Sequence, residues 1–411
     1  MIDKVKLGEV CDLSIGFVGT VTTQYEDGGV PFFRTLNIKP YKIIDDDLKR
    51  VTKEFHMSQK KSQLREGDVA MVHTGVPGIC CVIPKEYDDS NCIDMIVIKP
   101  HKDKVDPYYL TAYMNTVGYK HIENQQVGCI QKHFNLKDAV ELMIYLPDIE
   151  IQHKIGELVS VINEKIETNN KINAELETMA KIIYDYWFLQ FDFPNEEGKP
   201  YKSSGGKMVG NEELKREIPE GWEVGNLYDI ADFVNGLACQ KYRPISENNK
   251  LPVIKITEMH NGITESTEWV RADIPSKNII NDGDILFSWS ATLEAMIWSG
   301  GKAGLNQHIF KVIPNGYSKY YVYMQLSAYI INFVLMAEAR KTTMGHITTD
   351  HLKQSKIVLP PKDITAEFEN KVSTLFQRLI KNKEENRELT SLRDFLLPML
   401  MNGQVGFKEV Q

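Results

Sequence analysis

Two stretches of the chain decide the fold: LPDIEIQHKIGELVSVINEKIETNNKINAELETMAKII at residues 146–183 and LPPKDITAEFENKVSTLFQRLIKNKEENRELTSLRDFL at residues 359–396. In the first, apolar residues recur at spacings of three and four, which places them along one side of an α-helix. They are Ile155, Leu158, Ile162, Ile172, Leu176, Met179 and Ile183. The second stretch shows the same spacing, so the sequence predicts two long amphipathic helices.

The two stretches are copies of one pattern. Both open with Leu-Pro, and the second Leu-Pro lies 213 residues after the first (359 − 146). The same shift places Asn169 on Asn382 and Asn173 on Asn386. It also pairs the apolar positions Ile155 with Phe368, Val159 with Val372, Ile162 with Leu375, Ile166 with Leu379, Leu176 with Leu389, Met179 with Leu392 and Ile183 with Leu396. Self-similarity at a fixed period indicates an internal repeat.

The match continues upstream with small gaps. The matched segments are His133-Phe134-Asn135 with His346-Ile347-Thr348, Gly67-Asp68-Val69 with Gly283-Asp284-Ile285, and Leu7-Gly8-Glu9-Val10 with Val224-Gly225-Asn226-Leu227. Apolar periodicity alone would not reproduce the Leu-Pro starts, both asparagine pairs and the histidine. Each half of the chain is therefore a mixed module followed by a long helix.

The natural partner of each long helix is the other one. Apolar residues sustained at heptad spacing are typical of a coiled-coil seam, and buried asparagines in such a seam fix its register. The predicted spacer residues are Ile155, Leu158, Ile162, Asn169, Asn173, Leu176, Phe368, Val372, Leu375, Asn382, Asn386 and Leu389. A helix of about 38 residues is roughly 57 Å long, so the pair would form a rigid spacer. Packing of each helix on its own domain is the alternative.

The predicted fold is α+β, with two similar mixed α/β domains separated by two long antiparallel coiled-coil helices and related by approximate two-fold symmetry. The expected order is a domain at residues 1–148, a central helix at 149–190, a linker at 191–218, a second domain at 219–361 and a C-terminal helix at 362–403. The linker is predicted from its proline, glycine, serine and asparagine content.

Within the domains, short β-branched and apolar runs predict strands and longer runs predict helices. The expected strands include Val69–Val72, Met95–Ile98, Asp284–Phe287 and His308–Val312. The expected helices are Pro107–Tyr119 and Lys319–Met336. Long polar loops between these elements are where recognition usually occurs on a rigid scaffold.

Bulk composition sets limits on the function. The 411 residues are 42% hydrophobic and 25% charged, no run approaches a membrane span, and the first ten residues alternate charge and apolarity unlike a signal peptide, so we expect a cytoplasmic protein. The six cysteines show no metal spacing, and we expect buried thiols and no metal site. A net charge of -8 argues against DNA binding unless basic residues face the duplex and partner subunits add positive charge.

Four loop regions recur in both halves and carry side chains suited to bases and phosphates. The first region contains Thr22, Thr23, Gln24 and Tyr25 in one half, and Gln240, Lys241, Tyr242 and Arg243 in the other. The second contains Arg34 and Asn37, matched by Lys255 and Thr257. The third contains His73 and Thr74, matched by Ser288 and Trp289. The fourth contains Gln125, Gln126, Lys132 and His133, matched by Arg340, Lys341, Thr342, Thr343 and His346.

Each of these residues also has an ordinary structural explanation. An exposed arginine or glutamine is commonly a solvated side chain, and Tyr25, Tyr242 and Trp289 could pack within their loops. His133 and His346 could cap the region before the long helix. Recurrence in both halves is what favours a DNA-contacting set.

Catalytic signatures are missing from the sequence. We find no GxxxxGK[ST] phosphate loop, GxGxxG turn, HExxH site, GxSxG elbow or Asx-Pro-Pro-aromatic tetrapeptide. Asp148 and Glu150 lie at a helix start, where the helix dipole favours carboxylates. An isolated methyltransferase or nuclease, and a coiled-coil scaffold that binds only proteins, are the rival functions.

With the repeat and the two helices established, the chain resembles the specificity subunits of type I restriction-modification systems over essentially its full length. The segments that carry the resemblance are residues 61–68 (KSQLREGD) with His73-Thr74-Gly75, both Leu-Pro starts, Trp187-Phe188 with Phe191-Asp192-Phe193-Pro194, residues 218–222 (IPEGW) and residues 393–398 (RDFLLP). The second half departs from the first at Ser288-Trp289-Ser290, which would suit a different DNA sequence.

The resemblance implies a non-catalytic subunit that reads a split site in double-stranded DNA, with one target-recognition domain for each half-site. The helices would set the gap and dock two methyltransferase subunits, and restriction subunits would join that core. S-adenosylmethionine and ATP with magnesium would bind those partners, leaving this chain without a cofactor.

Overall fold

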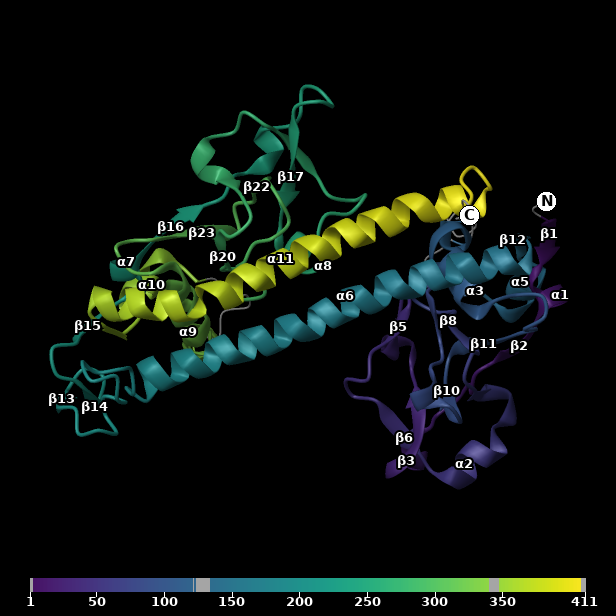
Figure 1. Ribbon diagram of the computed structural model, residues 1–411, viewed down its shortest axis with the longest axis horizontal. Helices are drawn as coiled ribbons and strands as arrows, with labels where there is room; N and C mark the ends of the chain where they lie inside the picture. Colours follow the sequence, from purple (N-terminus) through teal and green to yellow (C-terminus); the bar gives the residue numbers. More distant parts are fainter. Residues whose placement is uncertain (1–2, 121, 123–133, 340–346, 408–411) are drawn as a thin grey trace. The chain divides into compact units, whose positions relative to one another are not determined.

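The computed structural model describes residues 3–120, 122, 134–339 and 347–407 (Figure 1). The chain divides into two compact units, Met1–Glu167 with Glu388–Gln411, and Thr168–Arg387. Two long helices, α6 (Ile149–Tyr184) and α11 (Lys362–Met401), each contribute residues to both units. A π-helical turn, Asp185–Leu189, extends α6.

The first unit contains two four-stranded sheets. The inner sheet has the order β2-β11-β8-β9 and is antiparallel throughout; its strands are β2 (Cys11–Ile15), β8 (Val69–Val72), β9 (Cys80–Val82) and β11 (Met95–Pro100). The outer sheet has the order β6-β3-β10-β7, with β3 (Tyr25–Phe33), β6 (Lys49–Val51), β7 (Gln63–Leu64) and β10 (Ser90–Cys92). Strands β3 and β10 run parallel, and β1 (Asp3–Lys6) pairs with β12 (Met143–Leu146).

The second unit repeats this topology strand for strand. Its inner sheet has the order β16-β23-β20-β21, with β16 (Ala231–Asn235), β20 (Ile285–Ser288), β21 (Glu294–Ile297) and β23 (Ile309–Pro314). Its outer sheet has the order β18-β17-β22-β19, with β17 (Lys250–Ile254), β18 (Trp269–Arg271), β19 (Ile279–Ile280) and β22 (Ala303–Leu305). Strands β17 and β22 are the parallel pair, and β15 (Glu223–Gly225) pairs with β24 (Ile357–Leu359). The predicted internal repeat and the predicted fold class are confirmed.

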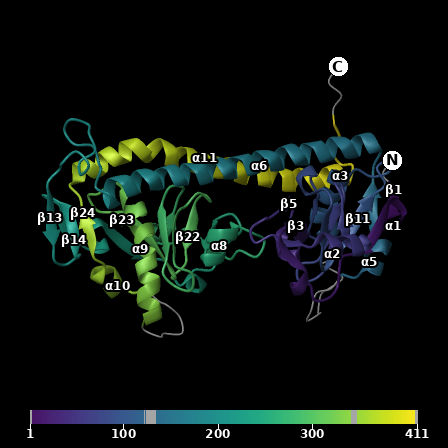
Figure 2. The same ribbon diagram turned by 90° about the horizontal axis from the view of Figure 1, so that it is seen from below.

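The shorter helices also recur. The first unit has α1 (Leu7–Val10), α2 (Lys53–Ser58), α3 (Pro107–Tyr113) with a π-helical extension (Met114–Gly118), and α5 (Leu136–Glu141). The second has α7 (Leu227–Ile230), α8 (Ile256–Asn261), α9 (Lys319–Ala339) and α10 (Thr349–Gln354), and α9 stands beside the sheets of its unit (Figure 2). The helices expected from Pro107 and from Lys319 and the four expected strands are present. A π-helical turn replaces the last part of the first of these helices.

Individual hydrogen bonds repeat as well. The turn before β8 needs Gly67 at φ +87°, and the turn before β20 needs Gly283 at φ +90°, a backbone region that favours glycine. In both turns the next residue is an aspartate that accepts a backbone N–H three residues upstream: Asp68 Oδ2 from Arg65 at 2.9 Å, and Asp284 Oδ2 from Asn281 at 2.8 Å. Burial raises the pKa of Asp68, although the hydrogen bond from the Arg65 amide and the nearby charge of Lys99 act to lower it. Shared turn chemistry of this kind indicates duplication of one module.

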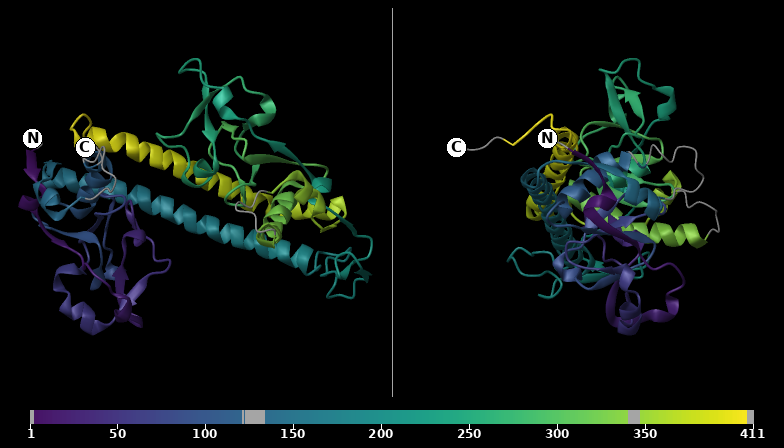
Figure 3. Two further views of the ribbon diagram at one scale, coloured as in Figure 1. Left: turned by 180° about the vertical axis from the view of Figure 1, so that it is seen from behind. Right: turned by 90° about the vertical axis from the view of Figure 1, so that its right-hand side faces the viewer.

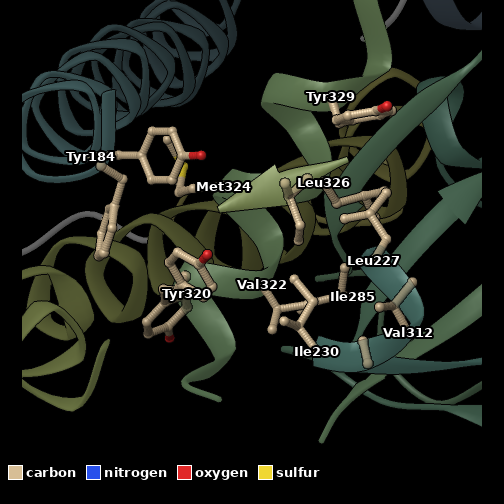
Figure 4. Close-up of a cluster of buried hydrophobic side chains, with 14 of the residues drawn as sticks. Tyr184, Leu227, Ile230, Ile285, Val312, Tyr320, Val322, Met324, Leu326 and Tyr329 are labelled. Atoms are coloured by element: carbon tan, nitrogen blue, oxygen red, sulfur yellow. The ribbon is translucent and has the colours of Figure 1, made fainter. Parts of the chain in front are cut away.

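Both long helices are part of the cores of both units. In the first unit, Ile155 and Val159 of α6 and Leu397 and Met401 of α11 are buried in one cluster with α3 and the inner sheet. In the second unit, Tyr184 of α6 is buried with Phe368, Val372 and Phe376 of α11, and Figure 4 shows it near Tyr320 and Met324 of α9. The ring of Tyr320 stacks on Phe376 at 4.2 Å. Each domain core therefore includes a segment of α6 and a segment of α11.

A row of asparagines joins the helices in an antiparallel seam within the second unit. Asn169 donates to Asn386 Oδ1 at 2.9 Å, and Asn382 donates to Asn173 Oδ1 at 2.9 Å. Because the repeat equates Asn169 with Asn382 and Asn173 with Asn386, each contact is the other with its partners exchanged. Such reciprocity is what a local two-fold axis produces. In the first unit, Arg393 donates to Asn163 Oδ1 at 2.7 Å, again in antiparallel sense.

The predicted seam between the long helices is wrong at one pair of positions. Met179 and Leu392 were placed on the seam, but their side chains are 49% and 48% exposed. The helix instead turns Ala180 and Arg393 inward, one residue further along, where Ala180 is 1% exposed. A heptad continued from Asn173 reaches position 180, and the apolar Met179 was mistaken for the continuation.

The segment expected to be a linker is folded. A hairpin of β13 (Met208–Asn211) and β14 (Arg216–Pro219) lies beyond the end of α6 (Figure 3). The ring of Phe193 stacks on Tyr201 at 4.7 Å and on Trp222 at 5.0 Å. Asp192 Oδ1 accepts the backbone N–H of Ser203 at 2.7 Å. Aromatic residues therefore order a stretch whose composition is typical of flexible chain.

Substituting Asn382→Leu should lower the free energy of unfolding by about 1–3 kcal/mol, because the buried amide of Asn173 loses a hydrogen-bond partner. Adding Asn173→Leu should recover most of that loss, since a matched apolar pair is well tolerated in a helical seam. Thermal denaturation of the two variants and the parent chain measures both effects. A double variant less stable than Asn382→Leu alone would contradict the pairing.

Candidate nucleic-acid interface

The first candidate region follows the first inner-sheet strand in each unit and depends on a glycine. A Cβ built on Gly236 would lie 2.1 Å from the backbone oxygen of Asn306, and one on Gly16 would lie 2.9 Å from Cys92 Sγ. This close approach lets Phe17 bridge to Ile93 and Leu237 to Asn306, so the chain crosses from the inner to the outer sheet. The loop that follows is positioned in the same way in both units.

Each of these loops ends in a short 3-10 turn that carries the candidate residues. Thr22 and Thr23 are exposed in the turn Thr22–Gln24, while Gln24 and Tyr25 are half-buried. In the second unit, Gln240, Lys241 and Arg243 are exposed around the turn Cys239–Lys241. Tyr242 is half-buried against a small core cluster. The exposed members of this region are available to a ligand.

In the first unit, the side chains of the second region make hydrogen bonds within their own loop. The guanidinium of Arg34 donates to the Asp47 carboxylate at 2.9 Å and to the Asp47 backbone oxygen at 2.6 Å. Hydrogen bonds from Lys49 and Arg34 lower the pKa of Asp47. Asn37 is fully buried and donates to the backbone oxygen of Ile44 at 2.9 Å. These two side chains hold a loop closed.

The two matching residues of the second unit differ in their surroundings. Lys255 forms an ion pair with Glu268 at 2.6 Å, whereas Thr257 is exposed on α8. In the first unit, Tyr25 begins strand β3 and Arg34 follows its last residue. A nine-residue strand is up to roughly 30 Å long, so the first and second regions lie at opposite ends of it.

In both units the third region is hydrogen-bonded to Phe134 or Ile347, the first described residue after the fourth region. The backbone oxygen of His73 accepts the N–H of Phe134 at 3.0 Å, and the backbone oxygen of Trp289 accepts the N–H of Ile347 at 3.0 Å. The structure thus pairs His73 with Trp289, one position away from the sequence alignment that paired it with Ser288. Ser288 is buried and donates to the Thr292 backbone oxygen at 2.7 Å, which makes it a structural residue.

His73 and Thr74 are half-buried, and the two side chains lie 3.0 Å apart at Nδ1 and Oγ1. The fourth region falls outside the described residues in both units. The residues concerned are Gln125, Gln126, Lys132, His133, Arg340, Lys341, Thr342, Thr343 and His346.

Sequence reasoning missed a basic and aromatic edge on the outer sheet of the second unit. Lys250 lies over the ring of Trp269 at 4.6 Å, and Arg271 over the ring of Tyr242 at 5.9 Å. The register of β17 and β18, which sets Lys250 opposite Arg271, creates this juxtaposition. Of these four residues only Tyr242 was among the candidates from the sequence, and nothing in the local sequence indicates Lys250, Trp269 or Arg271. His308, exposed beside the Trp289 ring at 5.5 Å, was missed for the same reason.

The long helices carry duplicated apolar pairs on their outer faces. Met179 and Ile182 are 49% and 61% exposed in the second unit, and Leu392 and Phe395 are 48% and 65% exposed in the first. The repeat shift of 213 (392 − 179) maps one pair onto the other. Residues three apart share a helix face, so each pair forms an apolar spot on its own unit.

In the described part of the chain, no group of three or more histidine, cysteine, aspartate or glutamate residues has the arrangement of a metal site. The five cysteines of that part are free and buried, and burial raises the pKa of Cys239 to about 11 and that of Cys81 to about 12. None of the helices described combines the length and apolarity of a membrane span.

The family of the type I restriction modification DNA specificity domain matches the chain twice, over residues 2–178 and 219–391. The chain therefore belongs to this family, whose members are the non-catalytic subunits that recognise DNA sequence in type I restriction-modification systems. A subunit of this class works with DNA and with the other subunits of its system. The two matches follow the two repeats described above.

Three similar proteins agree with this assignment. The HindI type I restriction enzyme specificity subunit of Haemophilus influenzae is 25% identical over 408 residues, covering 84% of this chain and 88% of that protein. The MjaIX specificity subunit of Methanocaldococcus jannaschii is 28% identical over 286 residues, covering 66% and 62%. The crystal structure of the type I S subunit from M. genitalium covers 100% of this chain and 97% of its own, with 14% identity and a TM-score of 0.58, a likeness of fold.

Substituting Lys241→Ala should reduce the salt dependence of DNA binding by about 0.9 in the slope of log K against log salt, the effect of one lost phosphate contact. Arg34→Ala should leave that slope unchanged and lower the melting temperature, because it releases Asp47. Binding titrations of the subunit, assembled with the other subunits of its system, at several salt concentrations separate these outcomes. An unchanged slope for Lys241→Ala would remove that residue from the interface.

Proposed function

We propose that this specificity subunit reads a bipartite DNA sequence, one half-site for each repeat, in a cytoplasmic complex. The observation that carries the proposal is that two domains of one topology present loops at equivalent places with different side chains. Thr22 and Thr23 occupy the first loop of one domain, whereas Gln240 and Lys241 occupy that of the other. Hydroxyls, amides and ammonium groups favour different partners on DNA, so equivalent loops would read different bases.

The helix pair would set the gap between the half-sites. Residues of α6 and α11 are buried in the cores of both domains, so each domain is built on both helices. The 36 residues of α6 at 1.5 Å rise span roughly 54 Å, a distance that exceeds one turn of DNA. Half-site spacing would then be a geometric property of the subunit.

The duplicated apolar spots suit docking of two copies of one partner. Met179 with Ile182, and Leu392 with Phe395, offer the same pattern of exposed surface twice. A partner present in two copies, as proposed for the methyltransferase subunit, would meet the same surface each time. Positive charge from these partners would offset the net charge of -8 that this chain presents to DNA. S-adenosylmethionine would act in the methyltransferase subunits, and ATP with magnesium in the restriction subunits that join them.

Exchange of residues 1–147 for the equivalent module of another specificity subunit tests half-site reading. The chimera, assembled with the methyltransferase subunit, should methylate a site in which one half has changed and the other has not. Methylome sequencing of cells carrying the parent or the chimera gives both sites directly. A change in both half-sites, in neither, or methylation by the chain without partner would contradict the proposal.

Introducing charged side chains at the exposed apolar pairs tests whether these pairs dock the methyltransferase subunits. Met179→Asp with Ile182→Asp should weaken binding of one methyltransferase copy at least about tenfold, because burying an unpaired carboxylate in an apolar contact is costly. Leu392→Asp with Phe395→Asp should do the same for the other copy, and the four substitutions together should abolish assembly. Native mass spectrometry counts the copies. Lys181→Ala, on the same helix, is the control, because it removes only an ion pair to Asp185 within that helix.

A further inference from the structure

One residue of the first domain has a backbone conformation that its side chain disfavours. Strands β4 (Ile38–Lys39) and β5 (Lys42–Ile43) form a hairpin whose two-residue turn is Pro40-Tyr41. Tyr41 has φ +68°, the left-handed region that bulky residues rarely adopt. Proline followed by a positive φ is the pattern of a type II turn, which favours glycine or asparagine at the position of Tyr41.

The second domain has a glycine at the corresponding offset. Arg34 and Lys255 are equivalent, because each begins the segment after its outer strand and its backbone N–H donates to the residue three positions on, Asn37 or Glu258. Seven residues after Lys255 lies Gly262, with φ +70°; seven residues after Arg34 lies Tyr41. At this offset the chain therefore has a glycine of positive φ at the end of α8 in one repeat and a tyrosine of positive φ in a hairpin turn in the other.

Arg393 of α11 covers the ring of Tyr41. The guanidinium carbon lies 4.6 Å from the ring centre, and the same side chain donates to Asn163 of α6 at 2.7 Å. The Arg393 side chain is 14% exposed, so the contact is largely removed from water, where attraction between a cation and an aromatic ring is strongest. The repeat equates Arg393 with Ala180 (393 − 213). Both the tyrosine and the arginine therefore lack counterparts in the second repeat.

Hydrogen bonds and an ion pair tie the hairpin to the inner sheet, to α6 and to the ends of the segment that joins two strands of the outer sheet. The backbone N–H of Tyr41 donates to Cys80 in β9 at 3.1 Å, and Lys42 pairs with Glu167 of α6 at 3.3 Å. At the base of the hairpin, Asn37 and Ile44 exchange hydrogen bonds of 2.7 and 2.9 Å. Beyond it, Arg34 is held by Asp47. The hairpin is therefore the connection between strands β3 and β6 and is tied to both long helices.

We propose that Tyr41 and Arg393 form a clamp that fixes the first recognition domain on the helix pair, so that it tolerates little variation in the gap between half-sites. This inference rests on the proposed function of the helices as a spacer. The strained turn is retained because a glycine would supply no ring for Arg393 to hold. Tyr41 and Arg393 are positioning residues and need not touch DNA.

The experiment uses the complete subunit assembled with its methyltransferase partner. Methyl transfer is measured on duplexes that carry both half-sites at the natural gap and at gaps one base pair shorter and longer. Arg393→Ala and Tyr41→Asn should each reduce the preference for the natural gap by about tenfold, the value of a buried cation–π contact. Asparagine suits the positive φ of the turn, so Tyr41→Asn removes the ring without adding backbone strain.

Two controls accompany these variants. Tyr41→Phe should keep the parental gap preference, because it retains the ring and the Tyr41 hydroxyl has no hydrogen-bond partner among the described residues. Lys181→Ala removes a cation whose partner, Asp185, lies on the same helix, and should also behave as the parent. A parental gap preference in both Arg393→Ala and Tyr41→Asn would overturn the clamp as a gap-setting device.

Hydrogen exchange separates this inference from the proposed function. Without DNA, Arg393→Ala should raise amide exchange in residues 38–43 about tenfold, while the central strands of the inner sheet keep their protection. Parental exchange in the hairpin would contradict the clamp whatever the DNA result. A parent complex that methylates all gaps equally would instead overturn the spacer function, and the inference with it.

Discussion

Asn173 and Asn382 face each other in a buried seam between two long helices, and the rest of the structure depends on that pairing. The contact between Asn169 and Asn386 is the symmetry-related copy of this one, because the repeat equates Asn169 with Asn382 and Asn386 with Asn173. Buried amides tolerate few alternative registers, because a shifted helix leaves them without partners. The seam therefore fixes which turn of α6 faces which turn of α11, and each domain core is built on the pair so defined.

The two domains share a scaffold and differ in how their outer parts are held. Equivalent contacts recur in the scaffold: the hydroxyl of Tyr109 in α3 donates to the Tyr145 backbone oxygen in β12 at 2.7 Å, and that of Tyr321 in α9 donates to the Val358 backbone oxygen in β24 at 3.1 Å. The outer sheet of the first domain is connected by a hairpin that contacts both helices. In the second domain a short helix, α8, takes that position in the chain. The two domains therefore share a duplicated scaffold and have diverged in their loops and in the segment that connects the strands of the outer sheet.

Much of this architecture could be predicted because it is periodic. The shift of 213 residues, the Leu-Pro starts and the asparagine pairs are patterns within one sequence, and they identified the repeat and the helices. Contacts that depend on strand register could not be predicted: the sequence around Lys250 says nothing of Trp269. Met179 shows a further limit, since an apolar residue beside a seam position has the same spacing signal as the seam itself. Arg34 and Asn37 have the composition of DNA contacts and instead close a loop, because polarity alone does not distinguish the two roles.

Lengthening the helix pair measures the central claim most directly. Seven residues inserted between Asn163 and Asn169, and seven between Asn386 and Arg393, add roughly 10 Å while keeping each helix face in register. If the pair sets the separation of the readers, methylation should move to sites with the same half-sites and a gap longer by about three base pairs, at ~3.4 Å each. Methylation at the original gap with undiminished efficiency would contradict the account.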